Sequence, residues 1–589
     1  MFPRDPSLGL AKSAPAPYAD IMISQVVSSR LALIPLLGLT LFFPFLQDAF
    51  PFFAHGDGVR ELVCVLELAF LASALFERDL CLPEPLSFSK TIRWTLGIWI
   101  VWSVAATLLS EHGARALVRQ SEWFLHGLTA AVLWAWRRAH PLQIRRIAAA
   151  IPIGFLVLSS VIAAELFWGA RPKGGAGIPG FENIRHYGYY AVIAIGYLTA
   201  VFAGSAATTS KAVGAFLALS ASWTLLFWTG SRGATFAAVG ALGVLWLLKI
   251  DRKWNRCIAL AAVAILLGAG LSTLLPRVTP SHGIQRILRH TGLWGEIPTH
   301  TTTTNFITNG RTDLWSTVAP QTLEAPWFGH GPDGYLFSGA MGTRSEQPHN
   351  VFLQFVFEWG FIGACAMVAL LFFVLRRQIW RVRALGRRSE PDDDQAARLG
   401  ALAALLGLSL QSLVDGTFHH SFSLALGAIS LAIVAQPRRD TPVPPPQQML
   451  RVGYCIVTGA LACVFALNTW VMIALSNAAL PEPGATRTQI VRAFPSRVES
   501  VDEGSSVFYW ANYWSKKDPQ LAIDWLHFGH LHARQPWRFY QLEGRLLMAE
   551  GDREAARKHF EKAIEHSYQD DRRELSQQFL EENNADLGN

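Results

Sequence analysis

Residues 212–250 read AVGAFLALSASWTLLFWTGSRGATFAAVGALGVLWLLKI, two long apolar runs separated by the polar turn 229–234. Each run is close to the ~20 residues that an α-helix needs to cross the hydrocarbon core of a bilayer. Gly230 and Gly233 lie on either side of the turn and allow close approach of the backbone. The stretch therefore predicts two membrane-spanning helices joined by a tight hairpin turn.

The same pattern recurs along most of the chain. Of the 589 residues, 51% belong to the set AVILMFWYC and only 16% are charged, against about 25% charged in soluble domains. A soluble fold has too little interior to bury so much apolar surface. We therefore predict an all-α polytopic membrane protein with about 12–14 transmembrane helices. Our thirteen predicted spans lie near 31–47, 61–76, 92–109, 123–136, 147–168, 187–204, 212–229, 233–250, 257–275, 351–375, 399–415, 422–436 and 454–475.

Lys and Arg gather in alternate loops. One such loop holds Arg137, Arg138, Arg145 and Arg146, and another holds the arginines of 376–388. The positive-inside rule places these loops in the cytoplasm, and the net charge of +7 is therefore explained by topology rather than by nucleic-acid binding. The acidic run 392–394 lies in one of these loops, where it is expected to balance arginine charge rather than hold a metal.

This topology predicts the domain organisation. Residues 1–30 form a cytoplasmic segment, and 31–475 form the transmembrane core. Within the core, the polar stretch of about 276–350 lies outside the membrane and is longer than a connection requires, which favours a functional loop. An odd number of spans also places the tail, 476–589, on the outer face.

The tail contains an internal repeat. The stretch DPQLAIDWLHFGHLHARQP, which starts at Asp518, is echoed by DREAARKHFEKAIEHSYQD, which starts at Asp552. An offset of 34 residues is the period of tetratricopeptide (TPR) helix pairs, in which small residues let two helices approach closely. We therefore predict a TPR-like helical domain that docks a protein partner or braces the membrane part. A plain helical hairpin bundle is the alternative.

Three polar motifs lie at the predicted outer face, where a charged group beside the bilayer is costly and usually functional. The first is the turn TGSRGA with Arg232, for which a hairpin with one interfacial arginine is the alternative interpretation. The second comprises NGRTDLW, with Arg311, and PWFGHGPDGY at 326–335. The third is QPHNVFLQ at 347–354, in which Asn350 is a plausible helix N-cap after His349.

Taken together and in this order, the motifs resemble the O-antigen ligase family (Wzy-C superfamily), which also includes O-antigen polymerases and bacterial protein O-oligosaccharyltransferases. The resemblance covers about 185–375 and extends to GFENIRHYGYY at 180–190, whereas the first 150 residues contain no specific motif. It implies a metal-independent membrane glycosyltransferase of GT-C type without a cofactor. The donor would be a polyprenyl-diphosphate-linked glycan at the periplasmic face of the bacterial inner membrane.

The resemblance also implies roles for individual residues. Arg232 and Arg311 would hold the donor diphosphate, and His349 would be the catalytic residue that activates or orients the acceptor hydroxyl. Guanidinium groups suit phosphate oxygens, and an imidazole suits removal of a hydroxyl proton. Arg185 and Asp415 are possible substrate-binding residues, with a helix-end polar residue as the alternative for Asp415.

The acceptor stays open at this stage. Lipid A-core is favoured, a protein Ser or Thr recruited by the tail comes second, and a growing glycan, which would make the protein a polymerase, comes third. A transporter for lipid-linked glycans is the alternative from another class, although a transporter should gather its polar groups near the bilayer midplane. A non-catalytic assembly scaffold built around the tail is the remaining alternative. His282, His290, His300 and His330 show no spacing typical of zinc ligands.

Overall fold

The chain is described from a computed structural model. The described residues are 30–49, 57–77, 89–167, 184–204, 209–248, 254–275, 283–290, 311–337, 347–385, 393–435, 448–478 and 536–565, with short pieces at 80, 82, 181 and between 511 and 584. Most of the predicted N-terminal segment and parts of the long loop and of the tail lie outside them.

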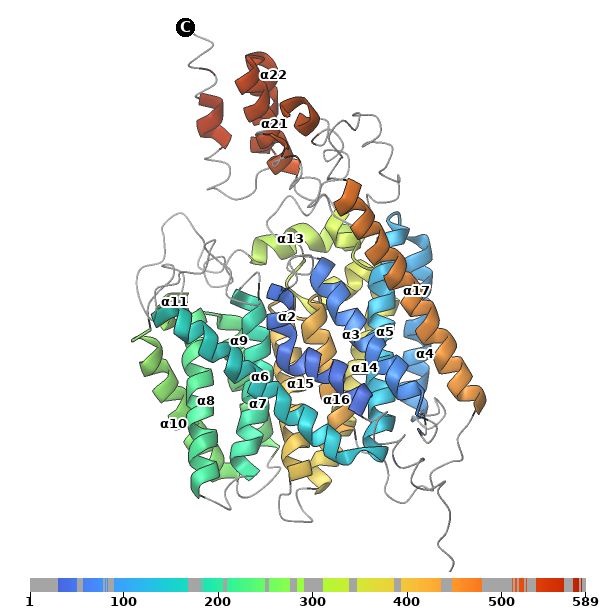
Figure 1. The fold of residues 1–589 in the computed structure, drawn as a ribbon, viewed down its shortest axis with the longest axis vertical. Coiled ribbons are helices and arrows are strands. Elements are labelled where there is room, and N and C mark those ends of the chain that lie inside the picture. Colours follow the sequence, from blue (N-terminus) through green and yellow to red (C-terminus); the bar gives the residue numbers. More distant parts are fainter. Residues whose placement is uncertain are drawn as a thin grey trace, which may run out of the picture.

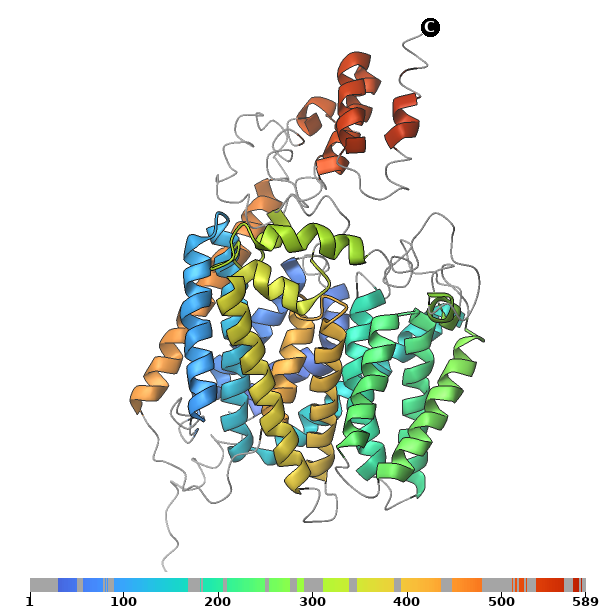
Figure 2. The same cartoon turned by 180° about the vertical axis from the view of Figure 1, so that it is seen from behind.

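The described part of the chain is a bundle of roughly parallel and antiparallel helices, with a helical hairpin beyond one end (Figure 1 and Figure 2). Each predicted span overlaps one helix, and the span 31–47 overlaps the helical stretch Arg30–Leu46. The bundle helices are η1 (Gly38–Phe42), α2 (Phe43–Ala49), α3 (Asp57–Leu75), α4 (Lys90–Leu109), α5 (Gly113–Ala139), α6 (Pro141–Phe167), α7 (Ile184–Gly204), α8 (Thr209–Thr229), α9 (Arg232–Leu247), α10 (Trp254–Ser272), α14 (Val351–Leu385), α15 (Asp393–Ser412), α16 (Ser421–Val434) and α17 (Gln448–Ala478).

Within the described part of the chain, five helices are long and apolar enough to cross a membrane, namely Lys90–Leu109, Pro141–Phe167, Ser210–Thr229, Val351–Ala384 and Gln448–Thr469. Four shorter apolar helices accompany them, namely Arg30–Leu46, Arg232–Leu247, Ala259–Ser272 and Ser421–Val434. The prediction of an all-α polytopic membrane protein is confirmed.

The predicted fourth span began at residue 123, but α5 begins ten residues earlier, at Gly113. Its first turns carry Arg115, Arg119 and Glu122, which an apolar scan assigns to a loop. In the fold all three are buried. The predicted start of α5 is therefore wrong. These charged residues form ion pairs inside the protein, and hydropathy along the sequence gives no information about such pairs.

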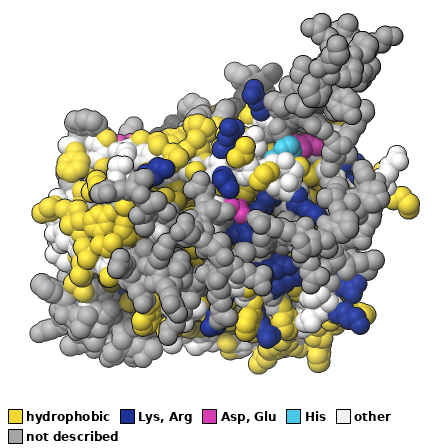
Figure 3. Space-filling view, turned by 90° about the horizontal axis from the view of Figure 1, so that it is seen from below, with side chains coloured by type: hydrophobic (Ala, Val, Ile, Leu, Met, Phe, Trp, Pro, Cys, Tyr) yellow, Lys and Arg dark blue, Asp and Glu magenta, His cyan; other side chains and the backbone are white. Residues whose placement is uncertain are grey.

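The two ends of the bundle differ in charge. We call the end where α3, α5, α9 and α14 begin the upper end, because α21 and α22 lie beyond it in Figure 1. The opposite, lower end is seen in Figure 3, where Lys and Arg side chains gather and Asp and Glu are few. The end of α5, with Arg137 and Arg138, and the end of α14, with Arg383, lie at the lower end.

Helices α7 and α15 pack closely in the middle of the bundle. A Cβ atom on Gly196 of α7 would lie 2.9 Å from the backbone nitrogen of Ala404, and one on Gly400 of α15 would lie 2.7 Å from the Tyr197 ring. Small residues allow such backbone approach where lipid provides no hydrophobic driving force. This packing fixes the upper end of α15, and the segment that follows it, beside α7 and α9.

Helix α14 contains a kink that the motif PWFGHGPDGY fills. Gly360 has φ 65° and ψ −179°, a conformation that is essentially restricted to glycine. The kink exposes backbone groups that the motif pairs: the N–H of His330 donates to Phe357 O at 2.8 Å, that of Gly331 to Glu358 O at 3.1 Å, and that of Phe361 to Pro326 O at 2.9 Å. We call this docking of 326–331 on the kink the glycine clamp.

In the tail, α21 (Pro536–Glu550) and α22 (Arg553–Glu565) form a hairpin. Gly544 packs against the ring of Phe560, and Ala556 is fully buried. The two repeat starts are alike, because Asp518 accepts from the N–H of Leu521 and Asp552 from that of Ala555, each at 3.0 Å. The start of the repeat therefore recurs in structure, while its assignment as TPR-like stays a prediction.

The kink provides a stability test. Gly360→Ala places a Cβ against the carbonyl of Trp327 and forces a side chain into a conformation reserved for glycine. We expect it to lower the free energy of unfolding by about 1–3 kcal/mol, measured by thermal unfolding in detergent. Gly97→Ala on α4 is the matched control, because a Cβ there meets nothing within 4 Å. Equal effects of the two substitutions would contradict the strained kink.

Candidate active site

His349, Arg311 and the turn that carries Arg232 lie close to Asp415. This carboxylate is 2% exposed and follows α15 at the upper end of the bundle. Its Oδ1 lies 3.0 Å from Nδ1 of His349 and 3.8 Å from Nη2 of Arg311. A Cβ atom on Gly233, next to Arg232, would lie 3.8 Å from its Oδ2. Three motifs that are far apart in the sequence therefore converge on one acidic side chain.

Each of these residues lies at a helix end. Arg232 is the first residue of α9, after a turn in which Gly230 has φ 64°. Arg311 is the first residue of α13 (Arg311–Thr322), a helix that lies across the upper end of the bundle (Figure 1). His349 comes just before α14. Because helix N-termini carry partial positive charge, this arrangement is suited to an anion.

The segment around His349 is held from two sides. Asn350 caps α14, as predicted, because its Oδ1 accepts from the N–H groups of Phe352 at 3.0 Å and Leu353 at 3.1 Å. Its Nδ2 donates to the carbonyl of Leu413 at 3.1 Å, which ties α14 to the segment that carries Asp415. On the other side, Nε1 of Trp315 in α13 donates to Pro348 O at 2.8 Å.

Two residues of this region have unusual backbone conformations. Among the described residues other than glycine, only His349 (φ 51°) and Asp333 (φ 58°) have a positive φ. This region is unfavourable for side chains other than those of Asn, Asp and His, and strain of this kind tends to occur at functional sites. Asp and His are among the few residue types that tolerate a positive φ, so the sequence permits this conformation at both positions.

Arg185 is not placed. It lies in the first turn of α7, and its side chain falls outside the described residues. Its neighbour His186 has its ring 4.1 Å from that of His420, between centroids, so the start of α7 lies beside the segment between α15 and α16.

A second cluster, which the sequence analysis missed, surrounds Asp333. Its Oδ2 lies 3.0 Å from Nη2 of Arg60 and 2.9 Å from Nε of Arg115, and its Oδ1 lies 3.4 Å from Nε of Arg119. All four side chains are buried. Asp333 belongs to the motif at 326–335, whereas the arginines come from α3 and α5. We call Asp333 and these three arginines the arginine cluster.

The arginine cluster continues into α5. Nε of Arg60 lies 2.9 Å from Oε2 of Glu122, and Nη1 of Arg119 donates to the same oxygen. Nη2 of Arg119 donates to the carbonyl of Phe418 at 2.6 Å. The only signal for these residues in the sequence was the presence of several charged residues at the start of two spans, and spacing along the chain could not show which carboxylate they meet.

Burial alone would raise the pKa of Asp333, but the charges of Arg60, Arg115 and Arg119 outweigh it and hold that pKa well below its usual range. The carboxylate is therefore ionised at any pH near neutrality. Its interaction with the arginines stabilises the fold above the unfolded pKa of about 3.9 and is lost as the pH falls toward the lower folded value.

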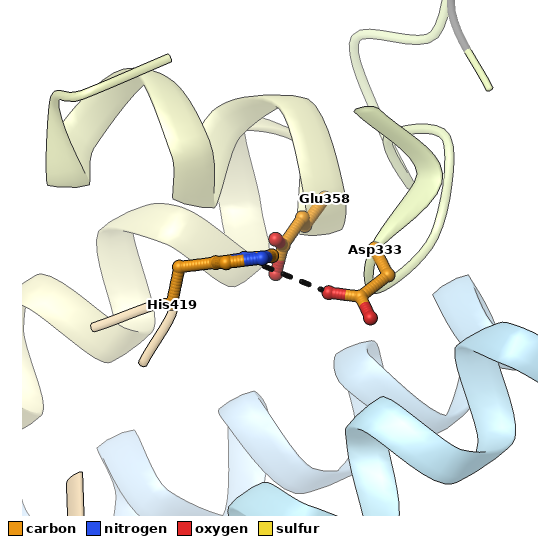
Figure 4. Close-up of side chains that lie close together, drawn as sticks. All are labelled: Asp333, Glu358 and His419. Atoms are coloured by element: carbon orange, nitrogen blue, oxygen red, sulfur yellow. Dashed lines mark ion pairs between the residues drawn. The ribbon is translucent and has the colours of Figure 1, made fainter. Parts of the chain in front are cut away.

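Asp333 also lies near Glu358 and His419, and ligand atoms of the three residues lie within 4.8 Å of one another (Figure 4). Two carboxylates and an imidazole could form a metal site in other surroundings. Here the same Asp333 carboxylate faces three guanidinium groups, which would repel a cation. The donor set fits an arginine partner better than it fits a metal.

Residues 215–368 match the family model described as O-Antigen ligase. This match confirms the resemblance to the O-antigen ligase family that the motifs predicted. A search of the curated proteins finds no match to the chain.

The matched region extends from α8 into the first half of α14. It contains Arg232, Arg311, His349 and Asp333. Asp415 and the three arginines of the arginine cluster lie outside it. The upper-end site is therefore built from the matched region together with the helices on either side of it.

The arginine cluster makes a pH-dependent prediction. Asp333→Asn leaves three buried guanidinium groups without their shared carboxylate, and breaking a buried ion pair costs roughly 3–5 kcal/mol. We expect a lower melting temperature at pH 7 and a smaller loss of stability between pH 5 and pH 3 than in the wild type, measured by thermal unfolding across that range. Asp313→Asn, on the exposed side of α13, is the control. Parallel curves for wild type and Asp333→Asn would show that this carboxylate is not stabilised by the arginines.

Proposed function

We propose that the protein is a membrane glycosyltransferase of the O-antigen ligase type, which transfers a glycan from a polyprenyl diphosphate carrier to an acceptor hydroxyl. The observation that carries the proposal is the convergence at Asp415 of His349, Arg311 and the turn of Arg232. The family match supports the same reaction class.

Donor binding follows from the two arginines. A guanidinium group can donate two parallel hydrogen bonds to phosphate oxygens, and each charge-assisted bond contributes about 1.5–3 kcal/mol. Arg232 begins α9 and Arg311 begins α13, so the partial positive charge of both helix ends adds to theirs. Together they would stabilise the charge that remains on the departing lipid diphosphate, without a metal or another cofactor.

Acceptor activation follows from the pair His349 and Asp415. Because Nδ1 of the ring faces the carboxylate, Nε2 is the nitrogen that can accept a proton from the acceptor hydroxyl. The hydroxyl oxygen then forms the bond to the anomeric carbon, while the bond between that carbon and the diphosphate oxygen breaks. The proton stays on the imidazolium, which Asp415 stabilises, and the electron pair leaves with the lipid diphosphate.

The acceptor and the location are proposed on the family resemblance. Lipid A-core is the favoured acceptor, and the site would face the periplasm from the inner membrane. The basic lower end is the end that the positive-inside rule places in the cytoplasm, which supports this orientation (Figure 3). Protein Ser or Thr is the second candidate, since the tail repeat lies beyond the same upper end as the site and could recruit a protein.

A transporter for lipid-linked glycans is a weaker candidate. Transporters usually bind their substrate near the bilayer midplane, between two halves of the fold. Here His349, Arg311 and Asp415 gather at helix ends on one side of the bundle. That position favours a reaction at one membrane face.

Substitution of the proposed site tests the reaction. We expect Arg232→Ala, Arg311→Ala and His349→Ala each to lower the transfer rate by about 10²- to 10⁴-fold, because each removes an interaction of the transition state. The rate is measured with purified protein in lipid and a labelled polyprenyl-diphosphate glycan. Arg146→Ala, an exposed arginine at the lower end, is the control and should keep the wild-type rate. Near-normal rates in all three site variants would refute the assignment.

A comparison of two acceptors tests the proposed acceptor, lipid A-core. With lipid A-core and a pilin-like protein offered separately, we expect label on lipid A-core alone. Removal of the chain after about residue 490 should then leave the transfer to lipid A-core unchanged, if the tail serves a protein partner and not this acceptor. Label on the protein, lost on truncation, would instead identify a protein O-oligosaccharyltransferase.

A further inference from the structure

We propose that Arg119 and Asp333 are positioning residues, which hold the segment 413–420 so that Asp415 meets His349. The inference deepens the proposed function and rests on it for the catalytic readout. Arg119 contacts Glu122, Phe418 and Asp333, and Asp333 contacts the arginines and His419. Both act through the segment between α15 and α16.

The segment 413–420 connects the proposed site to the arginine cluster. Asp415 lies near its start and contacts His349. Phe418 and His419 lie near its end, where the carbonyl of Phe418 accepts a hydrogen bond from Arg119. A shift of this end would therefore be transmitted over only a few residues to Asp415.

Arg119 and His419 share one partner. Nε of Arg119 lies 3.4 Å from Oδ1 of Asp333, and Nδ1 of His419 lies 3.8 Å from the same oxygen. Figure 4 shows the His419 ring directed toward Asp333, with Glu358 beside it. Arg119 is 0% exposed, so its guanidinium group has a fixed environment in which to hold both the segment and Asp333.

Asp333 itself is held rigidly. Arg60 and Arg115 pair with its other oxygen, and the glycine clamp holds the turn that carries it against the kink of α14. The oxygen that faces Arg119 and His419 therefore has a defined position. The segment 413–420 is docked onto a fixed point of the fold rather than onto a mobile loop.

The start of the segment is held by the neighbours of His349. Asn350 donates to Leu413 O, and the side chain of Gln347 packs so closely on Gly416 that a Cβ atom there would overlap it. The segment is thus fixed at one end by the residues around His349 and at the other by the arginine cluster. The distance between Asp415 and His349 depends on both attachments.

The chemistry of arginine makes the inference testable. Lysine would keep the charge beside Glu122, but its single ammonium group cannot reproduce the planar fork that donates to Phe418 O and faces Asp333. A displacement of about 1 Å in a catalytic group can cost about 10² in rate. We expect Arg119→Lys to lower kcat by about 10- to 100-fold, while KM for the lipid-linked donor changes less than about threefold.

A matched control lies on the same helix. Arg137, at the lower end of α5, is also buried. It donates to the backbone carbonyl of Ile433, in the last turn of α16, and to Asp394 at 2.9 Å. Arg137→Lys removes the same kind of contact at the far end of the bundle. It should lower the melting temperature about as much as Arg119→Lys and leave kcat within about twofold of the wild type.

A readout without turnover separates this inference from the proposed function. The ¹⁵N resonance of the His349 ring reports its pairing with Asp415 and can be identified among the 17 histidines by its loss in His349→Gln. In protein reconstituted in lipid nanodiscs, we expect the resonance to shift in Arg119→Lys and to stay in place in Arg137→Lys. Asp333→Asn should shift it in the same way, and it serves as the second variant if Arg119→Lys fails to fold.

The outcomes are distinct. If the wild-type protein shows no transferase activity, the proposed function is wrong. A shift of the His349 resonance in Arg119→Lys would still support the positioning role in that case. The inference is overturned if the His349 resonance does not move in Arg119→Lys. It is also overturned if Arg119→Lys and Arg137→Lys lower kcat to the same extent for the same loss of melting temperature.

Discussion

The interaction on which the upper end of the molecule depends is the pairing of one buried carboxylate, Asp333, with three buried arginines. Charges of this kind are expensive to bury singly, so each member requires the others to be in place. The carboxylate comes from a loop before α14 and the arginines come from α3 and α5. The pairing therefore joins the amino-terminal helices to the region that matches the O-antigen ligase family.

The motif PWFGHGPDGY has a structural role, docking on the kink of α14, which its glycine-rich composition does not indicate. A glycine-rich turn is easily interpreted as a phosphate-binding loop, but here its backbone pairs with the carbonyl groups freed by the kink at Gly360. Gly329 and Gly331 have positive φ and lie against neighbouring atoms that leave no room for a side chain. The motif thus delivers Asp333 to the arginine cluster, while the groups suited to chemistry, Arg232, Arg311 and His349, come from the motifs on either side.

This division separates support from chemistry within one region. The four side chains of the arginine cluster are buried and pair with one another, whereas Arg311 and His349 retain some exposure, at 16% and 11% of their side chains. Asp415 lies between the two groups. Under the proposed function, a carboxylate in this position would orient His349 and keep the acceptor site in place while a large lipid-linked donor binds.

The sequence by itself determined the class of the protein and most of its helices, because the length and apolarity of each span are local properties. It also identified Arg232, Arg311 and His349 as candidates, through motifs whose order resembles a known family. Asp415 was a candidate through its place at the outer end of a span, and Asn350 was predicted as an N-cap. The sequence could not show that His349, Arg311 and the turn of Arg232 converge on Asp415, since that depends on the packing of α15 against α7 and α9. Nor could it reveal the roles of Arg60, Arg115 and Arg119. A charged residue can be expected inside the protein only when its partner is known, and the partner Asp333 lies more than two hundred residues away in the chain. Only the tertiary structure brings these charges together, and with them the site.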